Sequence, residues 1–307
     1  MKRPRARPST RAFWRLARQS RRPLYTFVHG YVYSRWAYDY IGSGIGERRD
    51  LRRKRLLFAP FLARALSPRR WAAEYHGKVL PTAAVTRLLA VDEPVALDLP
   101  EQVIPFEAAR YLMLAGQGPF VALDCPCRLA RKHPCSPVDV CLIVGEPFAS
   151  FVLEHHPAHA RAIAREEAID IVAAEARRGH VHHAFFKQAM LGRFYAICNC
   201  CSCCCGAISA HRNGTPMLIS SGYVARVDTT TCIACGLCER TCAFAAIHVQ
   251  GAAQVDAAAC MGCGACVNLC PAGALQLERD ATKPTPLDVH LFDAVAGLPA
   301  EMARLLD

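Results

Sequence analysis

Two cysteine runs with the same spacing carry the clearest chemical signal in this sequence. They are Cys232-x2-Cys235-x2-Cys238-x3-Cys242 and Cys260-x2-Cys263-x2-Cys266-x3-Cys270, displaced by 28 residues. A cubane iron–sulfur cluster needs four thiolates; three can come from one run and the fourth from the other. We therefore predict two [4Fe–4S] clusters, one held by Cys232, Cys235, Cys238 and Cys270 and the other by Cys260, Cys263, Cys266 and Cys242.

Zinc is the structural alternative for such thiols, since paired Cys-x2-Cys motifs can form four-cysteine zinc sites. A zinc site needs neither a third cysteine at this gap nor an exchange of ligands between the two runs. We therefore favour iron–sulfur clusters.

The repeat resembles the bacterial two-cluster ferredoxins over residues 222–280. The resemblance implies a small pseudo-symmetric α+β fold with short hairpins, and clusters close enough for fast electron exchange. Those ferredoxins usually have proline after the last cysteine of both runs. Here Pro271 follows Cys270, but Ala243 follows Cys242. We expect a small difference in potential between the two clusters, because alanine keeps a backbone N–H near one thiolate.

Ten further cysteines precede the repeat. A thiolate group this dense repels itself unless cations hold it. The ten thiols could form up to two further clusters or one cluster of unusual shape; the alternative is a metal-storage stretch without a fixed cluster. The candidate ligands are Cys125, Cys127, Cys135, Cys141, Cys198, Cys200, Cys201, Cys203, Cys204 and Cys205.

Residues 105–280 also resemble a group of iron–sulfur proteins with a shared order of motifs. In this chain the motifs are Cys125-Pro126-Cys127-Arg128, Cys141-Leu142, Glu166-Glu167-Ala168, Val181-His182 and the run from Asn199 to Cys205. Cys204-Cys205-Gly206 is similar to a fragment of the motif in heterodisulfide reductase-type subunits. These resemblances imply cluster binding rather than a particular activity.

Six histidines occur between residues 155 and 183, and His182 is the one that matches the second group. Imidazole can ligate iron or carry a proton beside a cluster, so His182 is a candidate ligand; a solvated histidine is the alternative. Arg128 could offset thiolate charge or hold an anionic substrate, or form a surface salt bridge.

The chain of 307 residues has a formal net charge of +11, and its N-terminal part supplies the excess. Residues 1–110 contain 22 Lys+Arg and 9 Asp+Glu, whereas every cysteine lies at or beyond Cys125. We expect residues 2–22 to form a flexible basic arm. The basic region would dock an acidic redox partner or a membrane face. Nucleic acid is not an expected partner, because no DNA-binding motif is present.

The absence of an apolar run of about 18 residues argues against a transmembrane helix. Residues 24–46 are aromatic and flanked by basic residues, so they could lie on an anionic membrane; the alternative is that they pack on the protein's own core. Arg21-Arg22 resembles a twin-arginine export signal, but no uninterrupted apolar stretch follows. We expect a cytoplasmic protein, with a location at the inner face of the membrane as the alternative.

The expected fold class is α+β. We predict a basic, mostly helical region over 1–104, an α/β cysteine-rich domain over 105–221, a ferredoxin-like domain over 222–280 and a tail over 281–307 with a short amphipathic helix. Helices are expected over 47–75, 82–89, 105–115 and 160–178, with Gly179 capping the last one. Strands are expected over 120–123 and 141–145, and a turn over 42–46.

We interpret the protein as an iron–sulfur electron carrier. The first rival is a reductase whose upstream cysteines hold a substrate-binding centre; the surplus of thiols favours it, and the lack of a recognisable substrate motif opposes it. A cluster-based redox sensor with a nucleic-acid-binding arm is a third hypothesis, which a gel shift at low salt would test.

Overall fold

A nine-stranded sheet forms the centre of the computed structural model, which describes residues 6–58, 67–115 and 118–288. Its main path has the order β6-β4-β5-β8-β7-β1-β9, while β3 pairs with both β2 and β8. Its strands are β1 (Tyr75–Leu80), β2 (Pro94–Asp98), β3 (Tyr111–Ala115), β4 (Phe120–Leu123), β5 (Cys141–Val144), β6 (Ala160–Ile163), β7 (Val181–Lys187), β8 (Arg193–Cys200) and β9 (Leu218–Ile219).

The sheet has an apolar core on each face. Side chains alternate across a strand, so in β7 Val181 and Phe185 pack into one core while Ala184 and Phe186 pack into the other. The first core also contains the N-terminal aromatic residues, and the second contains α7 and α10 residues. The helices before the C-terminal segment are α1 (Pro8–Ala17), α2 (Pro23–Arg35), α3 (Ala37–Ile45), α4 (Arg49–Arg53), α6 (Pro68–Glu74), α7 (Thr82–Leu89), α8 (Pro126–Leu129), α9 (Phe148–His155), α10 (Arg165–Arg177) and α11 (Gly206–Arg212), with 3-10 turns η1 (Lys54–Leu56), η3 (Glu107–Ala109) and η4 (Gln188–Met190).

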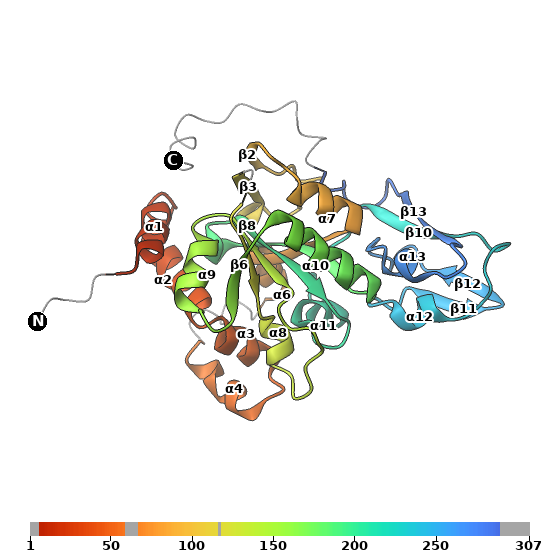
Figure 1. Ribbon diagram of the computed structural model, residues 1–307, viewed down its shortest axis with the longest axis horizontal. Coiled ribbons are helices and arrows are strands. Elements are labelled where there is room, and N and C mark those ends of the chain that lie inside the picture. Colours follow the sequence, from red (N-terminus) through yellow and green to blue (C-terminus); the bar gives the residue numbers. More distant parts are fainter. Residues whose placement is uncertain (1–5, 59–66, 116–117, 289–307) are drawn as a thin grey trace, which may run out of the picture.

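The C-terminal segment repeats one unit twice and lies at the opposite end of the molecule from α1 (Figure 1). Gly236 and Gly264 precede its two helices with φ of 72° and 79°, a region that favours glycine. Each helix ends one residue before the last cysteine of a run. The elements are β10 (Tyr223–Val227), α12 (Leu237–Thr241), β11 (Ile247–Gln250), β12 (Ala252–Val255), α13 (Ala265–Leu269) and β13 (Leu275–Arg279); β10 pairs with β13, and β11 with β12.

The structure contains helices and sheets, consistent with the expected α+β class. It confirms the helix at 82–89 and the strands at 120–123 and 141–144. The helix expected over 105–115 is wrong, because after η3 this segment forms β3. Its buried Leu112 and Leu114 are two residues apart, the period of a strand rather than of a helix.

The helix expected from residue 160 begins only at Arg165, since 160–163 form β6 and pair with β4. It ends before Gly179, whose φ of 76° fits the expected cap. The turn expected over 42–46 is also wrong: α3 continues to Ile45, and Gly46 alone adopts a left-handed conformation.

The N-terminal region is more ordered than a free arm. Residues 8–17 form α1, whose Phe13 and Ala17 are buried, and Ser9 Oγ donates a 2.6 Å hydrogen bond to Glu154. The expectation of a flexible arm over 2–22 is therefore wrong for α1; residues 1–5 lie outside the described residues. Helix α1 is stabilised because its apolar side chains, such as Phe13 and Ala17, pack against the rest of the protein.

The aromatic segment 24–46 forms α2 and α3 and packs largely inward, with Tyr33 and Tyr40 buried. Trp36 remains 43% exposed. Within the described part of the chain, we find no helix with the length and apolar character needed to span a bilayer.

The central sheet crosses the domain boundary predicted at residue 104, because β1 pairs with β7 and β2 with β3. The 47–75 segment contains α4, η1 and α6, with residues 59–66 outside the described part. In the tail, Thr285 N donates to Gln102 O and Leu287 is buried. The amphipathic helix expected in the tail lies outside the described residues.

Candidate metal centres

The two cysteine runs form two thiol cradles, each completed by a cysteine from the other run. We call the group of Cys232, Cys235, Cys238 and Cys270 the outer cradle, and the group of Cys242, Cys260, Cys263 and Cys266 the inner cradle. Backbone amides point at these sulfurs: Ala246 N lies 3.2 Å from Cys242 Sγ, and Ala253 N lies 3.5 Å from Cys232 Sγ. Such N–H groups disperse the charge of a thiolate. One small cavity is lined by Cys232, Cys235, Cys238 and Cys270, and the other by Cys242, Cys260, Cys263 and Cys266.

The cradles differ in their surroundings. Cys235 of the outer cradle is exposed, and its neighbour Ile233 is 64% exposed. In the inner cradle, Ala243 and Met261 belong to a core of the central sheet, and Cys263 packs against it. Burial raises the pKa of the Cys263 thiol to about 12. The inner cradle therefore adjoins the body of the protein, and the outer cradle adjoins solvent.

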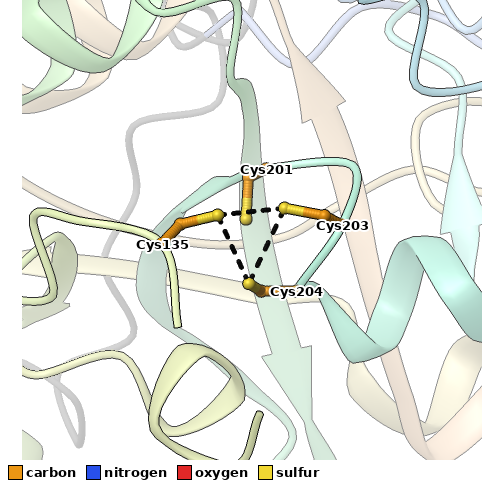
Figure 2. Close-up of side chains that lie close together, drawn as sticks. All are labelled: Cys135, Cys201, Cys203 and Cys204. Carbon is orange, nitrogen blue, oxygen red and sulfur yellow. Dashed lines mark hydrogen bonds between the residues drawn. The ribbon is translucent and has the colours of Figure 1, made fainter. Parts of the chain in front are cut away.

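The other ten thiols divide into two groups. The first, the four-thiol group, joins Cys135 to the loop after β8 (Figure 2). Cys135 Sγ lies 3.0 Å from Cys203 Sγ and 3.5 Å from Cys204 Sγ. Donation of the Cys135 thiol to Cys203 raises the pKa of Cys135 to about 12, because this hydrogen bond favours the protonated thiol. The ligand atoms of this group lie within 4.8 Å of one another and belong to Cys135, Cys201, Cys203 and Cys204.

The remaining six cysteines form the six-thiol ring. The register of β5 and β8 places Cys141 directly opposite Cys198. Successive hydrogen bonds link the ring from Cys127 through Cys125, Cys141, Cys198 and Cys200 to Cys205, and the electrostatic interaction between Cys205 and Cys127 closes it.

Neighbouring thiols in the six-thiol ring change one another's pKa. The thiols of Cys141 and Cys200 lower the pKa of Cys198 to about 6, because they donate to its thiolate. Hydrogen bonds to Cys125 and to Cys198 raise the pKa of Cys141 well above its usual value. Cations would remove this competition by holding several thiolates at once.

The ring lines a cavity of about 390 Å³, whereas each ferredoxin-type cradle encloses about 20 Å³. The protein therefore packs much more closely around the four thiols of each cradle than around the six-thiol ring. The space at the ring falls in the size range of pockets for small molecules.

Arg128 fixes the strand and loop that carry ring cysteines. It is 1% exposed, and its guanidinium donates to Glu175 Oε2 at 2.7 Å and to Asn199 O at 3.2 Å. It also donates to Pro137 O. The surface salt bridge considered for Arg128 is therefore a buried one. Because Asn199 lies between two ring cysteines, this network sets their position.

His182 is buried, and its Nδ1 lies 2.6 Å from Asn199 Oδ1. Burial lowers its pKa to about 4, so it is neutral near pH 7. Neither the cavity nor the four-thiol group includes it. His156 lines the cavity, His155 contacts Thr10 at 3.1 Å and His159 contacts Asp124 at 2.8 Å.

Sequence reasoning missed the cavity's polar end. Tyr33, Tyr75 and Tyr195 meet through their hydroxyls, and Tyr33 Oη lies 2.7 Å from Tyr195 Oη. Lys187 Nζ lies 3.5 Å from the centre of the Tyr33 ring and 4.4 Å from that of Tyr75. We call these four residues the tyrosine–lysine cage. The separation of its members along the chain, from 33 to 195, left no local pattern to recognise.

Comparison with known proteins supports the ferredoxin-like segment. Residues 231–274 match the 4Fe-4S dicluster domain family. No curated protein and no solved structure matches the chain. Residues 231–274 thus form an iron–sulfur, ferredoxin-like segment within a longer chain.

Proposed function

We propose that this protein transfers electrons through iron–sulfur clusters held in the two cradles and in the upstream thiol groups. The carrying observation is the gathering of all ten upstream cysteines into one four-thiol group and one six-thiol ring. Thiolates are soft ligands suited to iron–sulfur clusters and to zinc. Bound clusters would supply one-electron carriers.

The cradles suggest an order for the carriers. The outer cradle would exchange electrons with a partner, since it lies beside exposed Cys235 and Ile233. The inner cradle would connect it to the upstream thiols, because α11 begins after Cys205 and its His211 ring contacts Phe244, two residues after Cys242. The eight cradle cysteines would be the cluster ligands with the crossed assignment predicted from the sequence.

The experiment is to determine iron, acid-labile sulfide and zinc per chain in anaerobically purified protein, with EPR after dithionite reduction. About twelve to sixteen iron atoms per chain would support further clusters. About eight, with no additional EPR signal, would contradict them and leave the upstream thiols to zinc or to a structural role.

A reductase is the second candidate, favoured by the cavity of about 390 Å³ at the six-thiol ring. A cradle for a closed cluster encloses only about 20 Å³ elsewhere in this chain, so a closed cluster at the ring would leave most of this space open. A change in the EPR signal of the upstream centre on addition of a small molecule would support this candidate. If no molecule that binds the cavity changes this EPR signal, electron transfer would remain the only function proposed.

The basic N-terminal region would dock an acidic partner other than the one at the outer cradle, because α1 lies at the opposite end of the molecule from the C-terminal segment (Figure 1). Helix α1 and the residues after it expose a row of arginines, and opposite charge raises association rates. A steep fall with salt in the rate of reduction by an acidic ferredoxin would support this contact, and an unchanged rate would contradict it. The exposed residues are Arg11, Arg15, Arg18, Arg21 and Arg22.

A further inference from the structure

The cavity at the six-thiol ring has one end that offers hydrogen-bond donors. Lys187 is 4% exposed, lines the cavity and has no hydrogen-bond acceptor among the described residues. Its ammonium group lies against the rings of Tyr33, Tyr40 and Tyr75. Rings of this kind attract a cation, but they do not accept its N–H groups as an oxygen atom does.

The tyrosine hydroxyls extend this donor end. Tyr33, Tyr75 and Tyr195 contact one another, and burial raises the pKa of each well above its usual value. They therefore remain protonated, and a hydroxyl proton can rotate from a neighbour toward a ligand. A ligand with an acceptor oxygen would satisfy Lys187 and the hydroxyls together.

The charge of the lining selects the ligand further. No aspartate or glutamate lines the cavity among the described residues, while Lys187, Arg128 and Arg131 do. Arg128 is paired with Glu175, and Arg131 donates to Cys204 O at 2.9 Å. Lys187 is thus the basic residue of the lining that is left for a ligand. Burial lowers the pKa of Lys187 well below its usual value, and the charge of Glu74 opposes that shift. A bound anion would favour the charged form of Lys187 further. One buried ammonium balances a monoanion, whereas a dianion would leave a buried charge uncompensated.

The rest of the lining is largely apolar. Ile143, Phe148 and Met190 are buried side chains along the wall, and the thiols of the six-thiol ring form another part of it. A pocket with one polar end and an apolar wall orients a ligand with one polar group on an apolar body.

We propose that this cavity binds a small monocarboxylate with an apolar body, its carboxylate at the tyrosine–lysine cage and its body beside the six-thiol ring. The inference rests on the proposed function only in taking the ring as a metal centre. It names the class of molecule that would reach that centre.

The test measures binding of labelled benzoate to the anaerobically purified full chain by equilibrium dialysis. Benzamide serves as a neutral probe of similar shape. We expect benzoate to bind the wild type at least about tenfold more tightly than benzamide does. Lys187→Met should weaken benzoate by about tenfold or more, while Lys132→Met, at an exposed position, should not change it.

Absence of saturable benzoate binding at millimolar concentration would overturn the proposal, as would equal binding by wild type and Lys187→Met. Lys187 would then serve as a counter-charge for the metal centre. If Lys187→Met does not fold, Tyr75→Phe replaces it, with a several-fold loss expected and unchanged binding contradicting the proposal. Iron content of the same samples separates the hypotheses. Lys187-dependent binding at about eight irons would uphold the monocarboxylate site and contradict the proposed clusters at the ring.

Discussion

Arg212 Nε donates a 2.8 Å hydrogen bond to the carbonyl oxygen of Ala243, the residue that follows Cys242. The same guanidinium donates to Ser202 O at 3.1 Å, within the loop of the four-thiol group. One side chain at the end of α11 therefore joins the inner cradle to the upstream thiols.

Replacing Arg212 with alanine should loosen this junction. The change removes two hydrogen bonds from a charged donor, so we expect a loss of about 2 kcal/mol in the free energy of unfolding. Electron transfer from the cradles to the upstream centre should slow while iron content is unchanged, measured by stopped-flow reoxidation. Arg226→Ala removes exposed ion pairs with Glu278 and Asp280 and is the control. Equal rates in both variants would contradict the role of the junction.

Cys204→Ser should empty the four-thiol group while the cradles keep their clusters. An alcohol is a poor replacement for a thiolate toward soft metals, so bound metal should fall by one centre. Metal and sulfide analysis provides the measurement. Ser202→Ala changes a neighbouring loop residue that has no ligand atom in the group, and its metal content should equal that of wild type. Unchanged metal in Cys204→Ser would show that this group holds none.

Arg128→Met should destabilise the protein by about 3 kcal/mol, because buried Glu175 loses its buried partner and keeps only Arg178 and His180. Thermal unfolding provides the measurement. The double variant with Glu175→Met should recover part of the loss, since it leaves no unpaired charge of this pair. A double variant as unstable as the sum of the single changes would contradict the coupling.

The same pair has a defined pH dependence. Hydrogen bonds from His180 and Arg128 outweigh the opposing effect of burial and lower the pKa of Glu175 below its usual value. Its stabilising contribution is therefore present above the pKa of an unfolded glutamate and is lost as the pH falls through the folded value. The difference in stability between wild type and Glu175→Gln should shrink on acidification.

Ala243→Pro tests the difference between the cradles. Cys242 has φ −62° and ψ 108°, close to the φ −69° and ψ 111° of Cys270, which precedes Pro271. The backbone before residue 243 thus already suits a proline. Loss of one N–H near a thiolate should lower the potential of that cluster by roughly 40 mV at most, the equivalent of about 1 kcal/mol. Identical midpoints in a redox titration of both proteins would remove the idea.

Lys78 allows a prediction of how stability changes with pH above neutrality. Its ammonium group donates to Val103 O at 3.0 Å and Thr285 O at 2.8 Å, and burial lowers its pKa to about 7. The unfolded chain then binds more protons than the folded one between about pH 7 and 10, so this group makes stability rise with pH over that range. Tm of wild type minus that of Lys78→Met should increase from pH 7 to 9. A pH-independent difference would contradict the lowered pKa.

The sequence could predict features that depend on neighbouring residues. The two cysteine runs indicate their cradles because a loop around a cluster fixes the spacing of its ligands. The helix at 82–89 and the buried strand at 120–123 follow from local periodicity. The same reasoning failed at 105–115, where partners in the sheet determine the conformation and the local pattern does not.

Only the tertiary structure decided how the upstream thiols divide. Pairing of β5 with β8 sets Cys141 beside Cys198, and a loop contact brings Cys135 to Cys203. These neighbours are 57 and 68 residues apart in the chain, so no local spacing could assign them. The cage around Lys187 depends in the same way on three separate segments. The sequence by itself therefore determined the kind of chemistry, because ligand type is local, while long-range strand pairing decided which ligands meet and where a cavity remains beside them.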